Sequence, residues 1–177
     1  MSFVKEIPPA RSEGLLKEVY QRITEQSGNI ANIWKVNSLF PEMMALQWSL
    51  YRLVTFGEST LSNLRREMIA LVVSVANHCD YSIQHHQSLL RTLVRDEDFV
   101  SQLLLDIDQV KIEDGDRAML AYAVKLTKQP SQVNQADVEK LKLAGFTDRE
   151  IIEIAHLSGY YNFSNRIVNG LGVQPES

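Results

Sequence analysis

The stretch ANHCDYSIQHH, from Ala76 to His86, gathers most of the side chains in this chain that could act in catalysis. It contains the only cysteine, Cys79, and three of the four histidines, which are His78, His85 and His86. Thiols and imidazoles carry nucleophilic, redox and proton-transfer chemistry in proteins. Their concentration here predicts a catalytic pocket at the junction of two helices.

The spacing places several of these residues on one face of a helix that we predict from about Cys79 to Val94. The predicted inward side combines apolar and polar residues, which are Cys79, Ser82, Ile83, His86, Leu89, Leu90 and Leu93. His85 falls on the flank of this side. The start of a helix favours an anionic sulfur at Cys79, because free N–H groups and the helix dipole stabilise negative charge there.

Glu67 stands near the start of the preceding predicted helix, twelve residues before Cys79. Its carboxylate can reach His86 only if the two helices pack side by side. In that arrangement the carboxylate would orient and charge the imidazole, as a general base requires.

Each of these residues also has a structural interpretation. A lone cysteine is more often a small core residue than a nucleophile. A histidine on an apolar face is more often a core residue bonded to a carbonyl group, and a glutamate in the first turn of a helix often only complements the dipole. The spacing alone leaves the catalytic and the structural interpretations open.

A metal site is disfavoured, although histidine, cysteine and glutamate are suitable ligand types. His85 and His86 are adjacent and point about 100° apart on a helix. The sequence has no His-x-x-x-His pair and no second cysteine. It also lacks a glycine-rich phosphate loop and a dinucleotide motif. We therefore expect neither a metal nor a cofactor.

Length and composition predict a single domain over the 177 residues, with an extended arm at 1–11 and a loose tail at 172–177. The net charge of -4 argues against nucleic acid as a partner, because phosphate binding needs clustered Lys and Arg. The longest apolar run, from Met68 to Ala76, is too short to span a membrane. A lone cysteine and no recognisable signal peptide favour the cytoplasm.

Helical spacing recurs along nearly the whole chain, and no stretch alternates with period two for long, so we predict an all-α fold. Ser12 is expected to cap the first helix. In the helix from Met43 to Phe56, the side chains expected to face inward are Leu46, Leu50, Leu53 and Val54. A helix beginning at Ser62 or Asn63 is apolar on nearly all sides, which predicts a buried central helix. Thr147 and Glu150 form a predicted capping box for the last helix.

The segment REMIALVVSVANHCDYSIQHH resembles the core motif of the alkyl hydroperoxidase D (AhpD) and carboxymuconolactone decarboxylase superfamily, and specifically its peroxidase-related branch. That motif is a glutamate twelve positions before a Cys-x-x-Cys-x-x-x-His segment. Glu67, Cys79 and His86 match three of its four positions. The similarity continues through the segment from Asp116 to Val173 and covers most of the chain from about residue 40.

The resemblance implies an AhpD-like helical bundle that assembles into homo-oligomers. It also implies a pocket in which Glu67 and His86 relay protons to a thiol pair. In the peroxidases of the family, the second cysteine attacks an organic hydroperoxide, the first cysteine then forms a disulfide with it, and a thiol partner reduces the pair again.

Ser82 stands where the second cysteine is expected, and a hydroxyl is far less nucleophilic toward peroxide oxygen than a thiolate. Three explanations are open. Cys79 could act alone through a sulfenic acid that an external thiol reduces. The relay could instead serve acid–base chemistry, as in the lactone decarboxylases of the family. Ser82 could also be an engineered replacement of a native cysteine.

The function that we expect is the thiol-dependent reduction of organic hydroperoxides. Cys79 would be the redox thiol, His86 the general base and Glu67 its orienting acid, while Ser82 would hydrogen-bond a thiolate or a bound peroxide. Tyr81 and His85 are candidate pocket-lining residues, although Tyr81 could equally be a surface residue. The alternatives are a decarboxylase or isomerase of a small lactone, and an inactive oligomeric scaffold.

Overall fold

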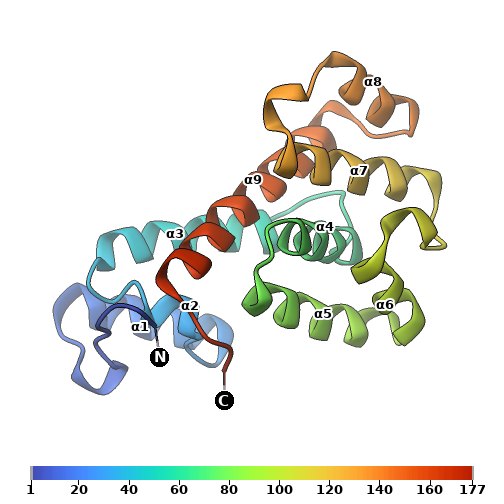
Figure 1. The fold of residues 1–177 in the computed structure, drawn as a ribbon. Coiled ribbons are helices and arrows are strands. Elements are labelled where there is room, and N and C mark those ends of the chain that lie inside the picture. The colour runs from blue at the N-terminus through green and yellow to red at the C-terminus, as the bar shows by residue number, and fades with distance from the viewer. Residues whose placement is uncertain (1, 177) are drawn as a thin grey trace. The chain divides into compact units, whose positions relative to one another are not determined.

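The computed structural model describes residues 2–176, which form helices joined by turns and loops, with no strand in that range (Figure 1). This confirms the predicted all-α fold. None of the helices in this range is long and apolar enough to cross a membrane. The α-helices are α1 (Gly14–Ser27), α2 (Asn32–Lys35), α3 (Pro41–Phe56), α4 (Asn63–Ala76), α5 (Asp80–Val94), α6 (Glu97–Leu105), α7 (Asp114–Lys128), α8 (Gln135–Leu143) and α9 (Asp148–Leu171).

The chain divides into two compact units. One unit contains α1, α2, α3 and the end of α9 from Ile167 onward, and the other spans Gly57–Arg166. All the candidate catalytic residues lie in the second unit. That the chain folds as a single domain stays a prediction.

The core of the first unit is built by aromatic and aliphatic side chains of α1, α2 and α3. Its buried members are Leu16, Val19, Tyr20, Ile23, Trp34, Met44 and Trp48. The rings of Trp34 and Trp48 meet edge to face, with 5.0 Å between centroids. The predicted cap at Ser12 is wrong, because its hydroxyl donates to the carbonyl oxygen of Pro9 at 2.7 Å and α1 begins at Gly14.

The inward face predicted for α3 is also wrong. The helix occupies the expected range, but Leu46, Leu50 and Leu53 are exposed. The opposite face, which includes Met44 and Trp48, is buried. Because α3 is apolar on both faces, its periodicity alone does not indicate which of them packs on α1 and α2.

In the second unit, α4 is the buried central helix, as predicted. Every residue from Arg66 to Ser74 is buried, and α4 packs most extensively on α5 and α7. The Ser62 hydroxyl accepts a hydrogen bond from the Arg65 N–H at 3.2 Å and caps the helix. The Arg66 guanidinium donates to the carbonyl oxygens of Leu61 and Gly57, which fixes the turn that carries Glu67.

The capping box predicted for the last helix is present. The Thr147 N–H donates to a Glu150 carboxylate oxygen at 2.8 Å, and the Glu150 N–H donates to the Thr147 hydroxyl at 3.3 Å. The bond from the Thr147 N–H is the main reason that the pKa of Glu150 lies below its usual value. The box sets the start of α9, a helix of 24 residues.

Replacing Asp137 with asparagine is expected to lower the melting temperature at neutral pH. The Lys125 ammonium donates to Asp137 Oδ2 at 2.6 Å and the Asn134 N–H donates to it at 2.9 Å, and these two bonds hold the pKa of Asp137 below its usual value. The carboxylate therefore stabilises the fold above about pH 4, the unfolded-state pKa, and this stabilisation is lost as the pH falls through the folded-state pKa.

Melting temperatures of the wild type and of Asp137→Asn, measured at pH 7 and at pH 3, check this prediction. The difference should be clear at pH 7 and smaller at pH 3. Glu139→Gln, which removes the same charge from an exposed position on the same helix, is the control. A difference that does not change with pH would contradict the assignment.

Candidate functional site

The structure brings Glu67 of α4 and His86 of α5 into direct contact. The Nδ1 atom of His86 lies 2.7 Å from the Oε2 atom of Glu67. The two residues are only 8% and 4% exposed, respectively. The predicted condition for this contact, two helices packed side by side, is met by α4 and α5. A carboxylate in this position can fix the tautomer and orientation of an imidazole.

Cys79 and Ser82 form a second contact at the start of α5. Cys79 is the N-cap residue of the helix and is fully buried, and its Sγ donates to the Ser82 hydroxyl oxygen at 3.4 Å. The Cys79 N–H donates to the carbonyl oxygen of Ser74 at 3.0 Å, which ties the cysteine to the end of α4. The preceding residue, His78, has a positive φ of 53° that turns the chain from α4 into α5.

One face of α5 carries the sulfur, the hydroxyl and the imidazole. Cys79, Ser82 and His86 follow one another at intervals of three and four residues, and all three are buried. The buried face is narrower than the sequence suggested, because Leu89 and Leu93 are exposed. The face can hold a thiol and a proton acceptor in a region with little water.

Tyr161 of α9 contacts this face and was not predicted from the sequence. Its ring meets the His86 ring edge to face, with 4.7 Å between centroids and 87° between planes, and it is buried. Two hydrogen bonds just after Tyr161 hold α9 against the end of α4: the Asn77 amide donates to Asn162 at 3.0 Å, and the Asn165 amide donates to the Ser74 hydroxyl at 3.2 Å. Tyr161 therefore restricts the orientation of the imidazole from the side of α9.

Tyr81 and His85, the two residues predicted to line the pocket, differ in exposure. Tyr81 is buried, which excludes the alternative of an exposed surface tyrosine. His85 is exposed, and its ring lies edge to face with that of His86, with 5.1 Å between centroids. Contact of either residue with a substrate stays a prediction.

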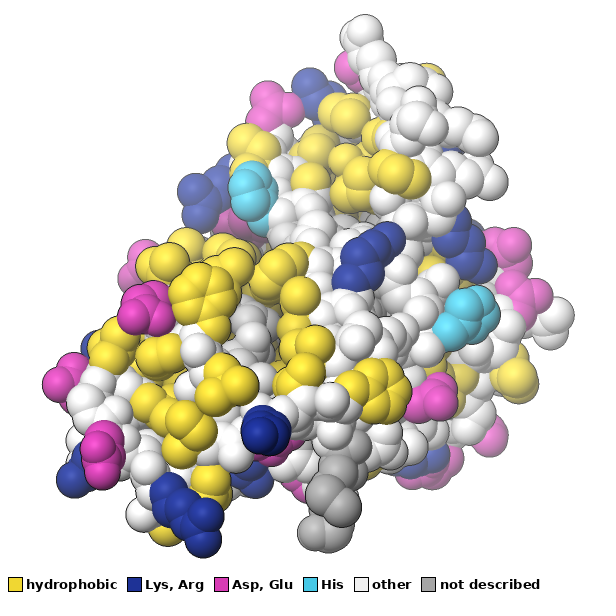
Figure 2. All heavy atoms as spheres, turned by 60° about the vertical axis from the view of Figure 1, so that its left-hand side comes forward, with side chains coloured by type: hydrophobic (Ala, Val, Ile, Leu, Met, Phe, Trp, Pro, Cys, Tyr) yellow, Lys and Arg dark blue, Asp and Glu magenta, His cyan; other side chains and the backbone are white. Residues whose placement is uncertain are grey.

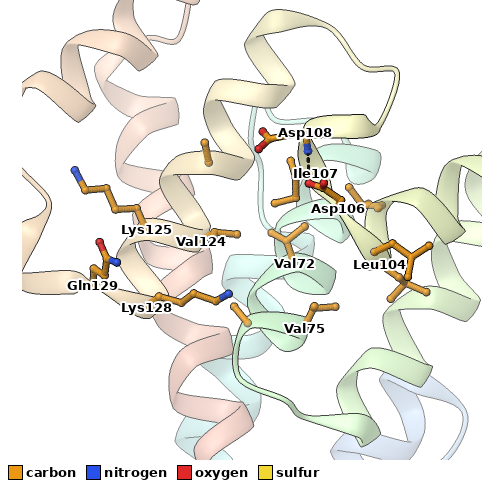
Figure 3. Close-up of a pocket in the computed structure, with 14 residues that line it drawn as sticks. Val72, Val75, Leu104, Asp106, Ile107, Asp108, Val124, Lys125, Lys128 and Gln129 are labelled. Carbon is orange, nitrogen blue, oxygen red and sulfur yellow. Dashed lines mark hydrogen bonds between the residues drawn. The ribbon is translucent and has the colours of Figure 1, made fainter.

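A cavity of about 450 Å³ lies on another part of α4, where it meets α6 and α7 (Figure 3). Figure 3 shows Val72 and Val75 from α4 and Val124 and Lys128 from α7 around it. None of the four predicted catalytic residues lines this cavity. The cavity and the buried face of α5 are therefore separate features of the second unit.

Within residues 2–176, no three histidine, cysteine, aspartate or glutamate side chains are grouped so that they could hold a metal ion. The described contacts in this region are those between Glu67 and His86 and between Cys79 and Ser82. The arrangement can remove a proton from a thiol or from a carbon acid bound beside the imidazole.

A family model matches the part of the chain that contains these residues. The sequence model of the carboxymuconolactone decarboxylase family matches residues 41–106, a range that includes Glu67, Cys79, Ser82 and His86. No protein of curated function matches the chain. The match confirms the resemblance predicted from the sequence motif.

Solved structures with the same fold cover nearly the whole chain. An uncharacterized peroxidase-related protein with an alkylhydroperoxidase AhpD core, from Ralstonia eutropha JMP134, is 26% identical over 99% of this chain and 93% of its own, with a TM-score of 0.89. A second peroxidase-related protein, from Silicibacter sp. TM1040, is 29% identical over 99% and 92%, with a TM-score of 0.87. The debrominase Bmp8 in complex with 2,3,4-tribromopyrrole is 17% identical over 98% and 91%, with a TM-score of 0.83, and shares the fold. The AhpD-like fold is thereby confirmed.

Proposed function

We propose that this chain, which resembles the AhpD-like and carboxymuconolactone decarboxylase proteins, is an enzyme that reduces organic hydroperoxides with an external thiol. The observation that supports this proposal is the 2.7 Å contact between the buried side chains of Glu67 and His86. His86 lies on the same face of α5 as Cys79. A carboxylate paired with an imidazole beside a thiol is the arrangement that generates a thiolate nucleophile.

The proposed cycle begins with removal of the Cys79 proton. The thiol donates to the Ser82 hydroxyl, and Ser82 lies one helical turn before His86, so the proton passes through the hydroxyl to the imidazole. The thiolate attacks the terminal, hydrogen-bearing oxygen of the hydroperoxide and the O–O bond breaks. The alkoxide leaves as an alcohol, taking the proton from His86, and Cys79 becomes a sulfenic acid.

Two molecules of an external thiol complete the cycle. The first displaces water from the sulfenic acid and forms a mixed disulfide with Cys79. The second attacks the external sulfur of that disulfide, which releases the Cys79 thiol and one molecule of external disulfide. This route needs no second cysteine in the chain and is therefore consistent with Ser82.

Replacing Cys79 with alanine is expected to abolish hydroperoxide reduction, because no other sulfur nucleophile is present apart from thioethers. The measurement is consumption of cumene hydroperoxide in the presence of dithiothreitol, with wild type and variant compared at equal concentration. The rate with Cys79→Ala should equal that of dithiothreitol alone. Circular dichroism of both proteins controls for folding, and a folded variant that keeps wild-type activity would overturn the proposal.

Acid–base chemistry on a small lactone is the second candidate function. It is favoured by the fact that the contact between Glu67 and His86 is complete without any sulfur, while the family's second cysteine is replaced here by Ser82. The same Cys79→Ala variant distinguishes the two functions, because a lactone decarboxylase or isomerase activity would persist in it. A debrominase also has this fold, so the fold does not restrict the substrate to a hydroperoxide.

An inactive scaffold is the third candidate and predicts that neither substrate is consumed. The small-molecule substrate, the thiol reductant, self-assembly into a homo-oligomer and a cytoplasmic location are part of the proposal. They are supported by the family resemblance and by the use of a single cysteine.

A further inference from the structure

The cavity between α4, α6 and α7 combines apolar walls with charged side chains at its edges (Figure 3). Its volume of about 450 Å³ is in the range of cavities that bind small organic molecules. The apolar walls come from α4, α6, α7 and the turn after α6, and they include Val72, Val75, Leu103, Leu104, Ile107 and Val124. The proposed hydroperoxide chemistry uses none of these residues.

The charged groups distinguish the cavity from the other large apolar feature of the surface, the outer face of α3. That face exposes Leu46, Leu50 and Leu53. The side of Figure 1 that carries α1 to α3 comes forward in Figure 2, where hydrophobic side chains gather into a broad patch. Apolar contacts are non-directional and do not identify a ligand. In the cavity, the charges restrict which ligand can bind between the apolar walls.

Lys128 supplies a positive charge at one end of the cavity. Its side chain extends from the end of α7 toward the cavity in Figure 3, and its ammonium takes part in none of the ion pairs within residues 2–176. The second lysine of the lining, Lys125, donates to Asp137 Oδ2 at 2.6 Å and points away from the cavity. An anionic group in the cavity can therefore pair with Lys128.

Asp108 supplies a negative charge at the opposite end. In Figure 3 it lies on the other side of Val72 from Lys128. Within the described part of the chain, its carboxylate takes part in no ion pair and accepts no hydrogen bond. Both carboxylate oxygens of the nearby Asp106 already accept hydrogen bonds, from the Asp108 N–H at 2.9 Å and from the Gln109 amide at 3.1 Å. A cationic group in the cavity can therefore pair with Asp108.

The segment that carries Asp108 is held in place by hydrogen bonds within the protein. The Arg117 guanidinium donates to the carbonyl oxygens of Ile107 and Val110 at 2.8 Å and 2.7 Å. The Asp106 carboxylate fixes the same turn from its other end. Because the backbone on both sides of Asp108 is already ordered, binding a ligand there costs little further conformational entropy.

Two unpaired charges of opposite sign favour a ligand with opposite charges at its two ends. A simple carboxylate would pair with Lys128 and leave Asp108 unpaired, and a simple amine would do the reverse. An α-amino acid has both charges on one carbon atom. An ω-amino acid separates its charges by a chain of methylene groups, which can cover the apolar wall around Val72.

We propose that this cavity binds a linear ω-amino carboxylate. The ligand carboxylate pairs with Lys128, its ammonium pairs with Asp108, and its methylene chain lies on the apolar walls. The site includes none of the four candidate catalytic residues. Its tests therefore do not depend on the proposed function.

Saturation-transfer difference NMR with 6-aminohexanoate, hexanoate and hexylamine tests both ends of the site. The probes have the same carbon chain and differ only in their charged groups. We expect 6-aminohexanoate to bind with a dissociation constant of about 1 mM or tighter. Hexanoate and hexylamine should each bind at least about fivefold more weakly, because each lacks one of the two ion pairs.

Two variants separate the ends of the site. Lys128→Met should weaken the binding of 6-aminohexanoate and hexanoate at least about fivefold without weakening that of hexylamine. Asp108→Asn should weaken the binding of 6-aminohexanoate and hexylamine without weakening that of hexanoate. Both side chains are exposed, and circular dichroism melts check that the variants are folded. Lys140→Met and Asp98→Asn, at exposed positions outside the cavity, are the matched controls and should change no dissociation constant.

Ala121→Phe tests the apolar walls. Ala121 lines the cavity from α7 and is exposed, so that a larger side chain there can fill the cavity without displacing a core residue. This variant should weaken the binding of all three probes, because the space for the carbon chain is lost.

Three results would overturn the proposal. The first is a dissociation constant for 6-aminohexanoate weaker than about 1 mM. The second is binding of hexanoate or hexylamine as tight as that of 6-aminohexanoate, which would mean that the site recognises only one charge. The third is an unchanged dissociation constant for 6-aminohexanoate in both Lys128→Met and Asp108→Asn, which would mean that the probe binds elsewhere.

Discussion

The Ser82→Cys variant is expected to reduce organic hydroperoxides at least about tenfold faster than the wild type, because it adds a second thiol that can attack the peroxide while Cys79 closes the disulfide, as in the peroxidases of the family. The new sulfur would stand at the position of the second cysteine in the family motif, one helical turn before His86. His86 and its partner Glu67 would then take the proton directly from the new thiol at position 82. The measurement is the rate of cumene hydroperoxide consumption with dithiothreitol.

The same variant should form an internal disulfide after one turnover without reductant. The Cys79 Sγ lies 3.4 Å from the Ser82 hydroxyl oxygen, and a modest side-chain rotation can bring two sulfurs at these positions to the bonded separation of about 2.05 Å. Intact-protein mass spectrometry would show a loss of two hydrogens. Free thiol titration would fall from two groups per chain to none.

Ser158→Cys is the matched control for this experiment. Ser158 is a fully buried serine of α9 whose hydroxyl donates to the Ile154 carbonyl oxygen, and it stands outside the motif. A cysteine there should give neither faster turnover nor a disulfide. If Ser82→Cys behaves like Ser158→Cys, a sulfur at position 82 is not activated by Glu67 and His86, and the roles that the family resemblance implies for this position do not hold here.

The candidate catalytic face of α5 could be predicted from the sequence because its geometry is local. Cys79, Ser82 and His86 lie within eight consecutive residues, and helical periodicity alone sets their common face. The contact with Glu67 could be stated only as a condition, since it depends on the packing of two helices. Tyr161 could not be predicted, because it stands 75 residues after His86 and reaches it only through the tertiary fold.

The helices themselves were predicted more reliably than the faces that they bury. Ser62 and Thr147 cap the helices expected of them, since a cap is decided by three or four neighbouring residues. In α3 the pattern is apolar on two sides, and the choice between them rests on the aromatic cluster of Trp34 and Trp48. The leucines predicted to face inward on α3 are exposed for this reason.

Glu67→Gln is expected to lower the rate of hydroperoxide reduction by about 100-fold to 10,000-fold, the range typical of losing general acid–base assistance. Glutamine has nearly the shape of glutamate and can still accept a hydrogen bond from His86 Nδ1. It removes the charge that stabilises the imidazolium formed when the Cys79 proton is taken up. The variant therefore tests the charge of the contact and leaves its packing in place.

A double-mutant cycle tests whether Glu67 acts on the rate through His86 or independently of it. If Glu67 acts only through His86, the double variant Glu67→Gln with His86→Gln should be no slower than His86→Gln alone, because the second change removes an interaction that is already absent. Rates that multiply across the two changes would instead mean that Glu67 and His86 act separately, and the relay would have to be abandoned.

Glu150→Gln provides the matched control for the loss of a glutamate near a helix start. Both glutamates follow an arginine and precede an isoleucine two positions later, but Glu150 belongs to the capping box of α9 and bonds to Thr147 instead of to an imidazole. Glu150→Gln should lower the melting temperature and leave the rate of hydroperoxide reduction unchanged. Because Glu67 is buried against His86, Glu67→Gln should lower the rate of hydroperoxide reduction even at temperatures where both variants are fully folded. The two glutamates stand in similar sequence contexts. A lower rate in Glu67→Gln alone would therefore assign the proton relay to the contact between α4 and α5.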